Sequence, residues 1–483
     1  MAHLGPCEFV GWLGCVESEN GGVPARNRMR QMWHGASGGS IRSAVLGACV
    51  GYPGAVTILE DRLGVWIRPI VQVLESKGIC PSHRDLDSWA VLTHHLHAGL
   101  VDQPVVFPNR LDVARLDSVR LATLAAHDPQ AIRRSISKQA PFGSYQAKFR
   151  FIDLFAGIGG FRVALQAVGG SAVFSSEIES SARRTYAHNF GDVPLGDIRS
   201  TTRTKSRFRS AARINELIPD FDVVAAGFPC QPFSLAGVSS RNHHGLNVGL
   251  SCSDQGTLFD DIMVIVRSKK RFGDGPNVLL LENVKNLYHH DSGRTFGIIK
   301  KGIEDSGYVA YTNVIDSLAV VPQRRKRLYF ICIREDLDRK FGSYIFPDLS
   351  PPIPPLPLRS ILERGRDLSE YQISSRLWAS HRRRSRRHAE RGNGFTVELA
   401  DLKQPANTLV SRYHKDGKDC LISMGPGRNP RMLTPRECAK LQGFDPNIFI
   451  LPPSRTAAYR AFGNAVTVPV VKRLAESIAR YLK

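Results

Sequence analysis

The feature that most constrains the fold is an apolar stretch that leads directly into a glycine-rich turn and a second apolar stretch. Lys148–Phe155 is typical of a buried strand, Ala156–Gly160 of a turn, and Phe161–Val168 of a helix. Strand, glycine turn and helix in this order let the backbone approach a ligand at the start of the helix. The spacing is not the GxGxxG of dinucleotide-binding folds, so by itself the turn indicates a structural role as readily as a binding site.

Further short apolar runs predict the rest of a sheet. They alternate with stretches of helical character, which indicates an α/β protein with a doubly wound sheet. In such folds ligands bind outside the carboxyl ends of the strands. The predicted strands or strand ends are Ser171–Ser176, Gly196–Ile198, Phe221–Ala226, Asn277–Leu281, Tyr308–Val314 and Leu328–Ile333.

Two acidic residues follow predicted strands after the glycine turn. Glu177 lies about 20 residues past the turn, where such folds bind a ribose diol. Asp197, at the end of the next candidate strand, has the chemistry to accept a hydrogen bond from an adenine amino group. Either carboxylate alone fits an exposed loop charge. The two in this order favour a cofactor that contains a nucleoside.

A cysteine and a glutamate occupy two further strand ends. Cys230 lies in Gly227–Ser234, a loop stiffened by two prolines that follows the strand Phe221–Ala226. A lone cysteine is more often a buried, inert thiol. Glu282 follows Asn277–Leu281, and a thiol and a carboxyl in one pocket form a nucleophile-and-acid arrangement. The polar segment from Ser234 to Gly256 is long for a connection, which indicates a functional loop.

Charge points to a polyanionic partner. The 483-residue chain carries a net charge of +21, and nucleic acid is the expected partner before a membrane surface. Basic residues concentrate in Arg199–Arg213, Arg267–Arg271 and Arg376–Arg391. The nine cysteines are scattered without a CxxC pair, which argues against a zinc site and a disulfide framework. No apolar run approaches the ~20 residues of a membrane span and no signal peptide is evident, so the cytoplasm is the expected location.

Composition also suggests domain boundaries. Six prolines between residues 347 and 357 predict a stiff linker, and Thr434–Glu437 predicts a capped helix start. The organisation we expect is an N-terminal extension at 1–146, a catalytic domain at 147–345, a small basic module at 346–430 and a C-terminal segment at 431–483. The extension contains a helical pattern over 111–138. It is either a small helical domain or, in part, not a folded domain.

Six short motifs occur in order at Phe151–Gly160, Gly227–Ser234, Glu282–Val284, Gln323–Arg327, Arg431–Phe444 and Phe462–Val466. With these residues assembled, the chain resembles the DNA (cytosine-5) methyltransferase family over about residues 151–471. The loops Arg391–Phe395 and Arg412–Gly417 further resemble the EcoRII-type branch, whose sites are of the CCWGG or CCNGG kind. The resemblance implies a Rossmann-like methyltransferase sheet, a target-recognition domain at 346–430 and C-terminal motifs that return to the catalytic domain.

The resemblance also implies a mechanism. Cys230 would add to cytosine C6, and Glu282 would hold or protonate N3, so that C5 accepts a methyl group from S-adenosylmethionine. Arg325 would help to hold the base, which must flip out of the duplex, and Arg327 would support the site. The cofactor contacts implied by the motifs are Phe155, Gly157, Gly159, Glu177, Asp197, Pro229 and Asn464. The implied DNA contacts are Ser234, Arg391, Asn393, Arg412, Tyr413 and Lys415.

Methylation of cytosine C5 in double-stranded DNA, within a restriction–modification system, is therefore the expected function. The expected partners are duplex DNA and a cognate restriction endonuclease, and a monomer is the expected state. The alternatives are a transfer RNA methyltransferase with the same chemistry and a DNA-binding regulator without catalysis. A nucleotide-dependent oxidoreductase is disfavoured by the missing GxGxxG and by the charge.

Overall fold

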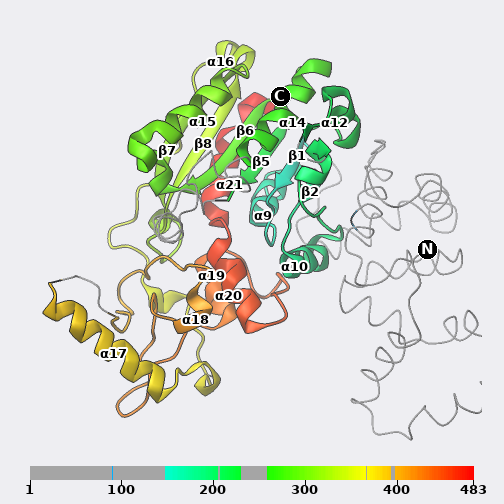
Figure 1. Ribbon diagram of the computed structural model, residues 1–483. Helices are drawn as coiled ribbons and strands as arrows, with labels where there is room; N and C mark the ends of the chain where they lie inside the picture. Colours follow the sequence, from blue (N-terminus) through cyan, green and yellow to red (C-terminus); the bar gives the residue numbers. More distant parts are fainter. Residues whose placement is uncertain are drawn as a thin grey trace, which may run out of the picture. The chain divides into compact units, whose positions relative to one another are not determined.

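The structure is a computed structural model that describes residues 147–204, 207–229, 258–365, 367–392 and 397–482, together with Ala90 (Figure 1). The chain divides into two compact units, residues 1–58 and 59–483, and every described residue belongs to the second. The predictions for the N-terminal extension, for the loop from Cys230 to Gly256 and for Asn393 lie outside the described residues. Within the described part, no helix is both long and apolar enough to cross a membrane.

A six-stranded sheet organises the part of the chain from 149 to 334. The strand order is β2-β1-β5-β6-β8-β7, and β8 alone runs antiparallel to its two neighbours. Between β1 and β5 the chain order changes direction, and this is where an open α/β sheet forms its ligand crevice. The strands are β1 (Phe149–Leu154), β2 (Gly170–Ser176), β5 (Val223–Gly227), β6 (Val278–Val284), β7 (Tyr308–Asp316) and β8 (Lys326–Arg334).

Helices cover both faces of this sheet. In Figure 1, α14 and α15 lie over the near face and α21 lies behind the strands. The helices of this part are α9 (Gly160–Gln166), α10 (Ser180–Phe190), α11 (Arg199–Thr202), α12 (Ala211–Leu217), α14 (Leu258–Phe272), α15 (Arg294–Glu304), α16 (Glu335–Phe341) and α21 (Val468–Ser477). The small elements of this part are the hairpin of β3 (Arg203–Thr204) with β4 (Arg207–Phe208) and the 3₁₀ segments η3 (Lys285–Gly293) and η4 (Ser317–Ala319).

The fold confirms the predicted doubly wound α/β class, and most predicted strands are present with bounds shifted by a few residues. The strand expected to end at Gly196–Ile198 is the exception. There the chain makes only an isolated bridge between Leu195 and Ser176. The proline-rich residues 347–357 contain no helix or strand, in keeping with a linker.

A second group of helices lies beyond the linker. Its elements are α17 (Ser375–Glu390), α18 (Tyr413–Asp416), α19 (Pro435–Leu441) and α20 (Arg455–Asn464), with 3₁₀ turns at Leu358–Ser360 and Ser369–Tyr371. Helix α19 begins with the predicted capping box: the Thr434 hydroxyl accepts from the Glu437 backbone N–H, and the Glu437 carboxylate accepts from the Thr434 N–H. These contacts satisfy two backbone donors that a helix start leaves free.

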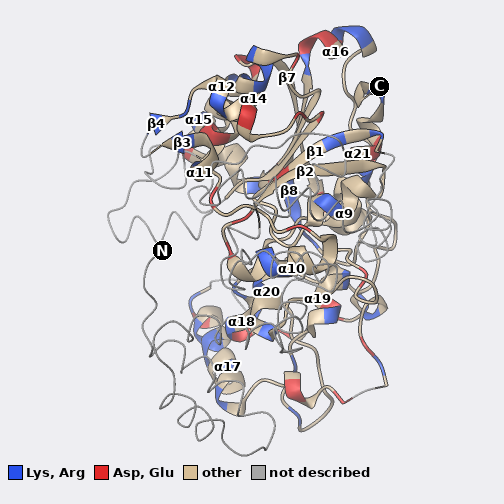
Figure 2. Cartoon of the chain, turned by 90° about the vertical axis from the view of Figure 1, so that its right-hand side faces the viewer, with Lys and Arg blue, Asp and Glu red and all other residues tan. Residues whose placement is uncertain are grey.

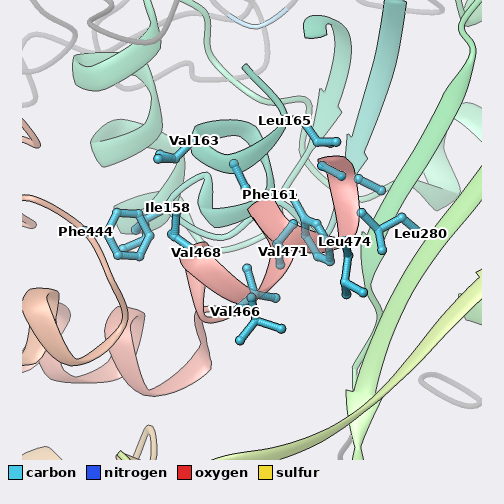
Figure 3. Close-up of a cluster of buried hydrophobic side chains, with 14 of the residues drawn as sticks. Ile158, Phe161, Val163, Leu165, Leu280, Phe444, Val466, Val468, Val471 and Leu474 are labelled. Atoms are coloured by element: carbon cyan, nitrogen blue, oxygen red, sulfur yellow. The ribbon is translucent and has the colours of Figure 1, made fainter. Parts of the chain in front are cut away.

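The end of the chain returns to the sheet. Figure 3 shows Phe161 and Leu165 of α9 beside Val471 and Leu474 of α21, next to Leu280 of β6. All five side chains are fully or almost fully buried. Burying a side chain of this size contributes roughly 1.5–3 kcal/mol, so this cluster holds α21 firmly on the sheet. The last turn, η7 (Ala479–Leu482), adds a buried Tyr481, whose backbone oxygen accepts from Asn277.

Gly463 offers a sharp test of the packing of α20. A Cβ at this position would lie 2.3 Å from the backbone N of Ser411 and from the backbone C of Val410, and backbone atoms cannot move aside. We expect Gly463→Ala to lower the free energy of unfolding by about 1–3 kcal/mol or more. Gly297→Ala in α15 is the matched control, because a Cβ there meets nothing within 4 Å. That variant should gain up to about 1 kcal/mol. Equal effects of the two changes in urea unfolding would contradict the packing described.

Candidate active site

The parallel strands bring several predicted site residues to one edge of the sheet. Phe155 follows β1, Glu177 follows β2 and Pro229 lies two residues past β5. Glu282 lies within β6, opposite Gly227 of β5 in the register. Strand β8 runs the other way, so its first residues, including Arg327, reach the same edge. The topology therefore gathers residues from four separate motifs.

The glycine turn and Glu177 form the first part of the site. Phe155 and Gly157 both have left-handed backbones, with φ of 57° and 56°. The Glu177 carboxylate accepts from the Gly157 N–H at 2.8 Å and from the Glu179 N–H at 2.7 Å. Burial raises the pKa of Glu177, while the hydrogen bonds from these two N–H groups lower it. A Cβ on Gly157 would meet nothing within 4 Å, so open space lies over the turn.

Gly159 has a different role from Gly157. Its φ is 90°, and a Cβ there would lie 2.2 Å from the Phe190 ring of α10. The residue therefore allows α9 to begin close against α10. The structure shows a packing role for Gly159, and the cofactor contact implied by the resemblance stays a prediction.

Asp197 lies next to the same turn. Leu195, two residues before it, exchanges backbone hydrogen bonds with Ser175 and Glu177 at the end of β2. The Asp197 carboxylate is half-buried and accepts from the Arg199 side chain, with 2.7 Å between Arg199 Nη2 and Oδ2. An adenine amino group would therefore have to share this carboxylate with Arg199. The ribose and adenine residues predicted from sequence are thus brought together.

Glu282 and Arg327 form the second part of the site. Arg327 Nε lies 3.1 Å from Glu282 Oε1, and the two side chains are 17% and 12% exposed. Burial raises the pKa of Glu282, and the charges of Arg327 and Arg325 oppose that rise. A carboxyl with a raised pKa retains a proton nearer to neutral pH, which suits a general acid. The pair lies beside Gly227, where a Cβ would be 3.7 Å from Glu282 Oε2.

Arg325 lies two residues before Arg327, in the loop that leads into β8. Its guanidinium is buried and donates to the backbone oxygens of Leu409, Gly463 and Ala465 at 2.8–3.1 Å. These contacts join the loop before β8 to two distant parts of the chain. The charge of Arg325 also acts on Glu282, with which Arg327 forms the ion pair.

Sequence reasoning missed two residues that support this site. The Asn283 side chain donates to the Phe228 oxygen at 3.4 Å, which links β6 to the loop that leads to Cys230. Gln323 is fully buried, donates to the Leu441 oxygen and accepts from the Leu409 N–H. Both residues lie inside the motifs Glu282–Val284 and Gln323–Arg327. The feature in the sequence that could have indicated their roles is a side-chain amide next to a predicted strand.

The remaining predicted residues are scattered. Asn464 is exposed at the end of α20 and Pro229 is half-buried. Arg391, Arg412 and Lys415 are exposed, as a DNA contact requires. Cys230, Ser234 and Asn393 lie outside the described residues.

Tyr413 differs from the other predicted DNA contacts because it is fully buried. Its hydroxyl donates to the Cys420 oxygen and accepts from the Leu433 N–H. The side chain therefore has no free surface for DNA in this structure.

A buried ionic cluster lies beneath the glycine turn. Arg162 of α9 pairs with Asp192, donates to the Tyr186 hydroxyl at 3.2 Å and lies over the Tyr186 and Phe190 rings. Asp153 of β1 is fully buried beside this group. Burial raises the pKa of Asp153 well above its usual value, and the single guanidinium of Arg162, already paired with Asp192, only partly opposes this.

Comparisons with known proteins identify the family of the chain. The model of the C-5 cytosine-specific DNA methylase family matches residues 149–480. The type II methyltransferase M.SsoII of Shigella sonnei is 41% identical over 335 residues, which cover 68% of this chain and 80% of that protein. A DNA-cytosine methyltransferase of Escherichia coli (strain K12) is 38% identical over 376 residues, or 69% and 78% of the two chains.

Solved structures show the same fold at low sequence identity. DNMT2 of Spodoptera frugiperda, in a mutant form, superposes with a TM-score of 0.51 at 19% identity, over 68% of this chain and 99% of that one. EhMeth of Entamoeba histolytica gives 0.50 at 18%, over 69% and 97%. The family match extends over most of the described residues. The chain therefore belongs to the C-5 cytosine-specific DNA methylase family and is an enzyme of that class.

The Asp153 cluster predicts how stability depends on pH. Because the native pKa of Asp153 is raised, the folded protein keeps a proton that the unfolded chain releases above about pH 4. Stability is therefore lost as pH rises towards the native pKa. An asparagine side chain cannot ionise, so we expect the melting temperature of Asp153→Asn, relative to wild type, to increase as pH rises above about 4 towards the native pKa of Asp153. Thermal unfolding at several pH values measures this. A difference that stays constant across the range would contradict a neutral Asp153.

Proposed function

We propose that the protein transfers a methyl group from S-adenosylmethionine to C5 of cytosine in a short specific sequence of double-stranded DNA. The observation that carries the proposal is the Glu282–Arg327 pair beside Gly227, three residues before Cys230 in the chain. A carboxyl with a raised pKa and a guanidinium at this edge of the sheet suit the activation of a pyrimidine ring for attack by a thiolate.

The residues present fit the cofactor. The open space over Gly157 and the half-buried Glu177 carboxylate at the turn form a cradle that a side chain at residue 157 would fill. Glu177 would accept from a ribose diol, Asp197 from an amino group of the base, and Phe155, Pro229 and Asn464 would border the bound molecule. When bound, S-adenosylmethionine supplies an electrophilic methyl group.

The chemistry at the base falls to three residues. The Cys230 thiolate would add to C6, while Glu282 would hold or give a proton at N3, so that C5 gains electron density and takes the methyl group. Loss of the C5 proton then releases Cys230. Because the ring edges and C6 lie inside the stack, the base would have to flip out of the duplex. Arg327 would orient Glu282 and oppose the rise in its pKa.

The biological setting is a restriction–modification system in this proposal. Several relatives are named type II methyltransferases, among them M.SsoII and M.DsaV of Dactylococcopsis salina, at 41% and 36% identity. A cognate endonuclease for the same site would then exist. A site of the CCWGG or CCNGG kind stays our prediction, with the exposed Arg391, Arg412 and Lys415 as candidate DNA contacts. A monomer is proposed, since one chain carries one complete set of motifs.

Bisulfite sequencing of plasmid DNA from expressing cells tests the function and the nucleophile together. Wild type should protect cytosines in one short recurring context, and Cys230→Ala should protect none, because no thiolate remains to add to C6. Methylation by both proteins would exclude Cys230 as the nucleophile. Unmodified DNA in both samples, with folded protein, would favour RNA as the substrate or a binder without catalysis.

The two arginines of the Gln323–Arg327 motif should separate activity from stability. Arg327→Ala should lower kcat by about 10²-fold or more, as loss of a site donor does, with little change in melting temperature. It should also move the pH dependence assigned to Glu282 to higher pH, because a cation that lowers its pKa is removed.

Arg325→Ala should instead lower the melting temperature. It leaves three backbone oxygens without their donor, at a cost of about 1–3 kcal/mol for each that stays buried. Arg327→Lys and Arg325→Lys are the charge-preserving controls. Equal stability losses for the two alanine variants, or a kinetic defect confined to Arg325→Ala, would contradict the assignment.

A further inference from the structure

Helix α17 carries an arginine-rich face that the proposed site does not use. His381 is its one buried residue, and the imidazole lies 3.0 Å from the Asp416 backbone oxygen of α18. The first turn is held by Asn429, which donates to Ser375, and Ser385 accepts from the Val397 N–H. These few contacts attach the helix to the rest of the described chain and leave much of its surface in solvent.

Five arginines lie on that free surface: Arg376, Arg382, Arg383, Arg386 and Arg387. With about 100° of rotation per residue, they occupy an arc of roughly 140°. In Figure 2 the blue that marks Lys and Arg recurs along α17. Among the ion pairs of the described residues, none involves these five side chains. Arg382 lies over the Trp378 ring of the same helix, with its guanidinium carbon 5.9 Å from the ring centre.

An arrangement of this kind is unfavourable in the free protein. Arg382 and Arg386, and likewise Arg383 and Arg387, are like charges four residues apart, which destabilise an isolated helix. A bound polyanion would reverse the sign of that interaction. The arginines are exposed and, among the described residues, without an ion-pair partner, so their donors are available to a partner without breaking a salt bridge within that part of the protein.

The spacing of the arginines fits a nucleic-acid backbone. From Arg376 to Arg387 the helix rises roughly 16 Å, and a strand of B-DNA carries about five phosphates over that length. Arginine on phosphate positions a protein without reading sequence. Exposed aromatic side chains do not alternate with these arginines, whereas stacking on aromatic residues is typical of single-strand binding. Duplex DNA is therefore the occupant that fits best.

We propose that α17 binds the sugar–phosphate backbone of duplex DNA beside the methylated sequence, and so extends the contact beyond the bases that are read. This proposal rests on the proposed function, in which duplex DNA is the substrate. The chain runs from α17 directly to Arg391, and His381 contacts α18, so the helix adjoins the loops that we expect to read the bases. Arg391, Arg412 and Lys415 would set the sequence, and α17 would supply affinity.

The test compares two fourfold charge removals. In the α17 variant, R382Q/R383Q/R386Q/R387Q, glutamine keeps the helix propensity. The matched control, K300Q/K301Q/K472Q/R473Q, removes four cations from α15 and α21. Fluorescence anisotropy measures the dissociation constant of each protein at several salt concentrations. Both duplexes carry the unmodified target sequence; one has flanks of about 15 base pairs and the other has flanks of about two base pairs. Circular dichroism checks that both variants fold.

On the long duplex, the slope of log affinity against log salt should fall by about 3 to 4 for the α17 variant, since each phosphate contact contributes about 0.9. The loss of affinity should be smaller on the short duplex, and the ratio of specific to random sequence should not change. The control should keep the wild-type slope.

An unchanged slope for the α17 variant would overturn the proposal. So would an equal loss in the control, or a loss of affinity that is the same on the long and the short duplex. The proposed function is judged separately, by the 5-methylcytosine that wild type forms. Wild type that binds duplex through α17 but forms no 5-methylcytosine would refute the function and support the role of the helix.

Discussion

Two buried side chains of one loop, Gln323 and Arg325, hold the separate parts of the described chain together around the site. Between them they bond the backbone at Leu409, Leu441, Gly463 and Ala465. Buried carbonyl groups need such donors, because an unsatisfied one costs about 1–3 kcal/mol. The loop before β8 is thus the place where the sheet, the basic module and the C-terminal helices meet.

A second buried contact sets the direction of the returning chain. Arg431 binds the Glu437 carboxylate through both terminal nitrogens at 2.8 and 2.9 Å, and the side chains are 4% and 0% exposed. Glu437 also accepts from the backbone N–H groups of Glu363 and Thr434. Removal of one partner of such a pair costs about 3–5 kcal/mol. These hydrogen bonds fix the start of α19. Through α19 and α20 they also influence how α21 packs against α9.

The sequence predicted the strands of the sheet, whereas the contacts between their side chains could not be inferred from it. Buried strands such as β6 and β8 are continuous apolar runs, so burial on both faces marks them in the sequence. Which of Arg325 and Arg327 contacts Glu282 depends instead on the antiparallel register of β6 with β8, where Arg327 lies opposite Val284. Registry between strands that lie far apart in the chain leaves no local signal. Tyr413 illustrates the same limit, since its burial comes from Cys420 and Leu433, and the loop pattern alone suggested exposure.

The same contacts that build the fold also set the electrostatics of the site. Val466 and Glu282 both border the position that a Cβ on Gly227 would occupy, so the segment after α20 lies close to the carboxyl. That segment is held by Arg325 through Gly463 and Ala465. Burial raises the pKa of Glu282, and the charges of Arg327 and Arg325 lower it. Arg325 therefore acts on Glu282 in two opposing ways: it holds the segment that lies near the buried carboxyl, and its charge lowers the pKa of that carboxyl. The acidity of Glu282 thus depends on how the C-terminal chain packs against the sheet.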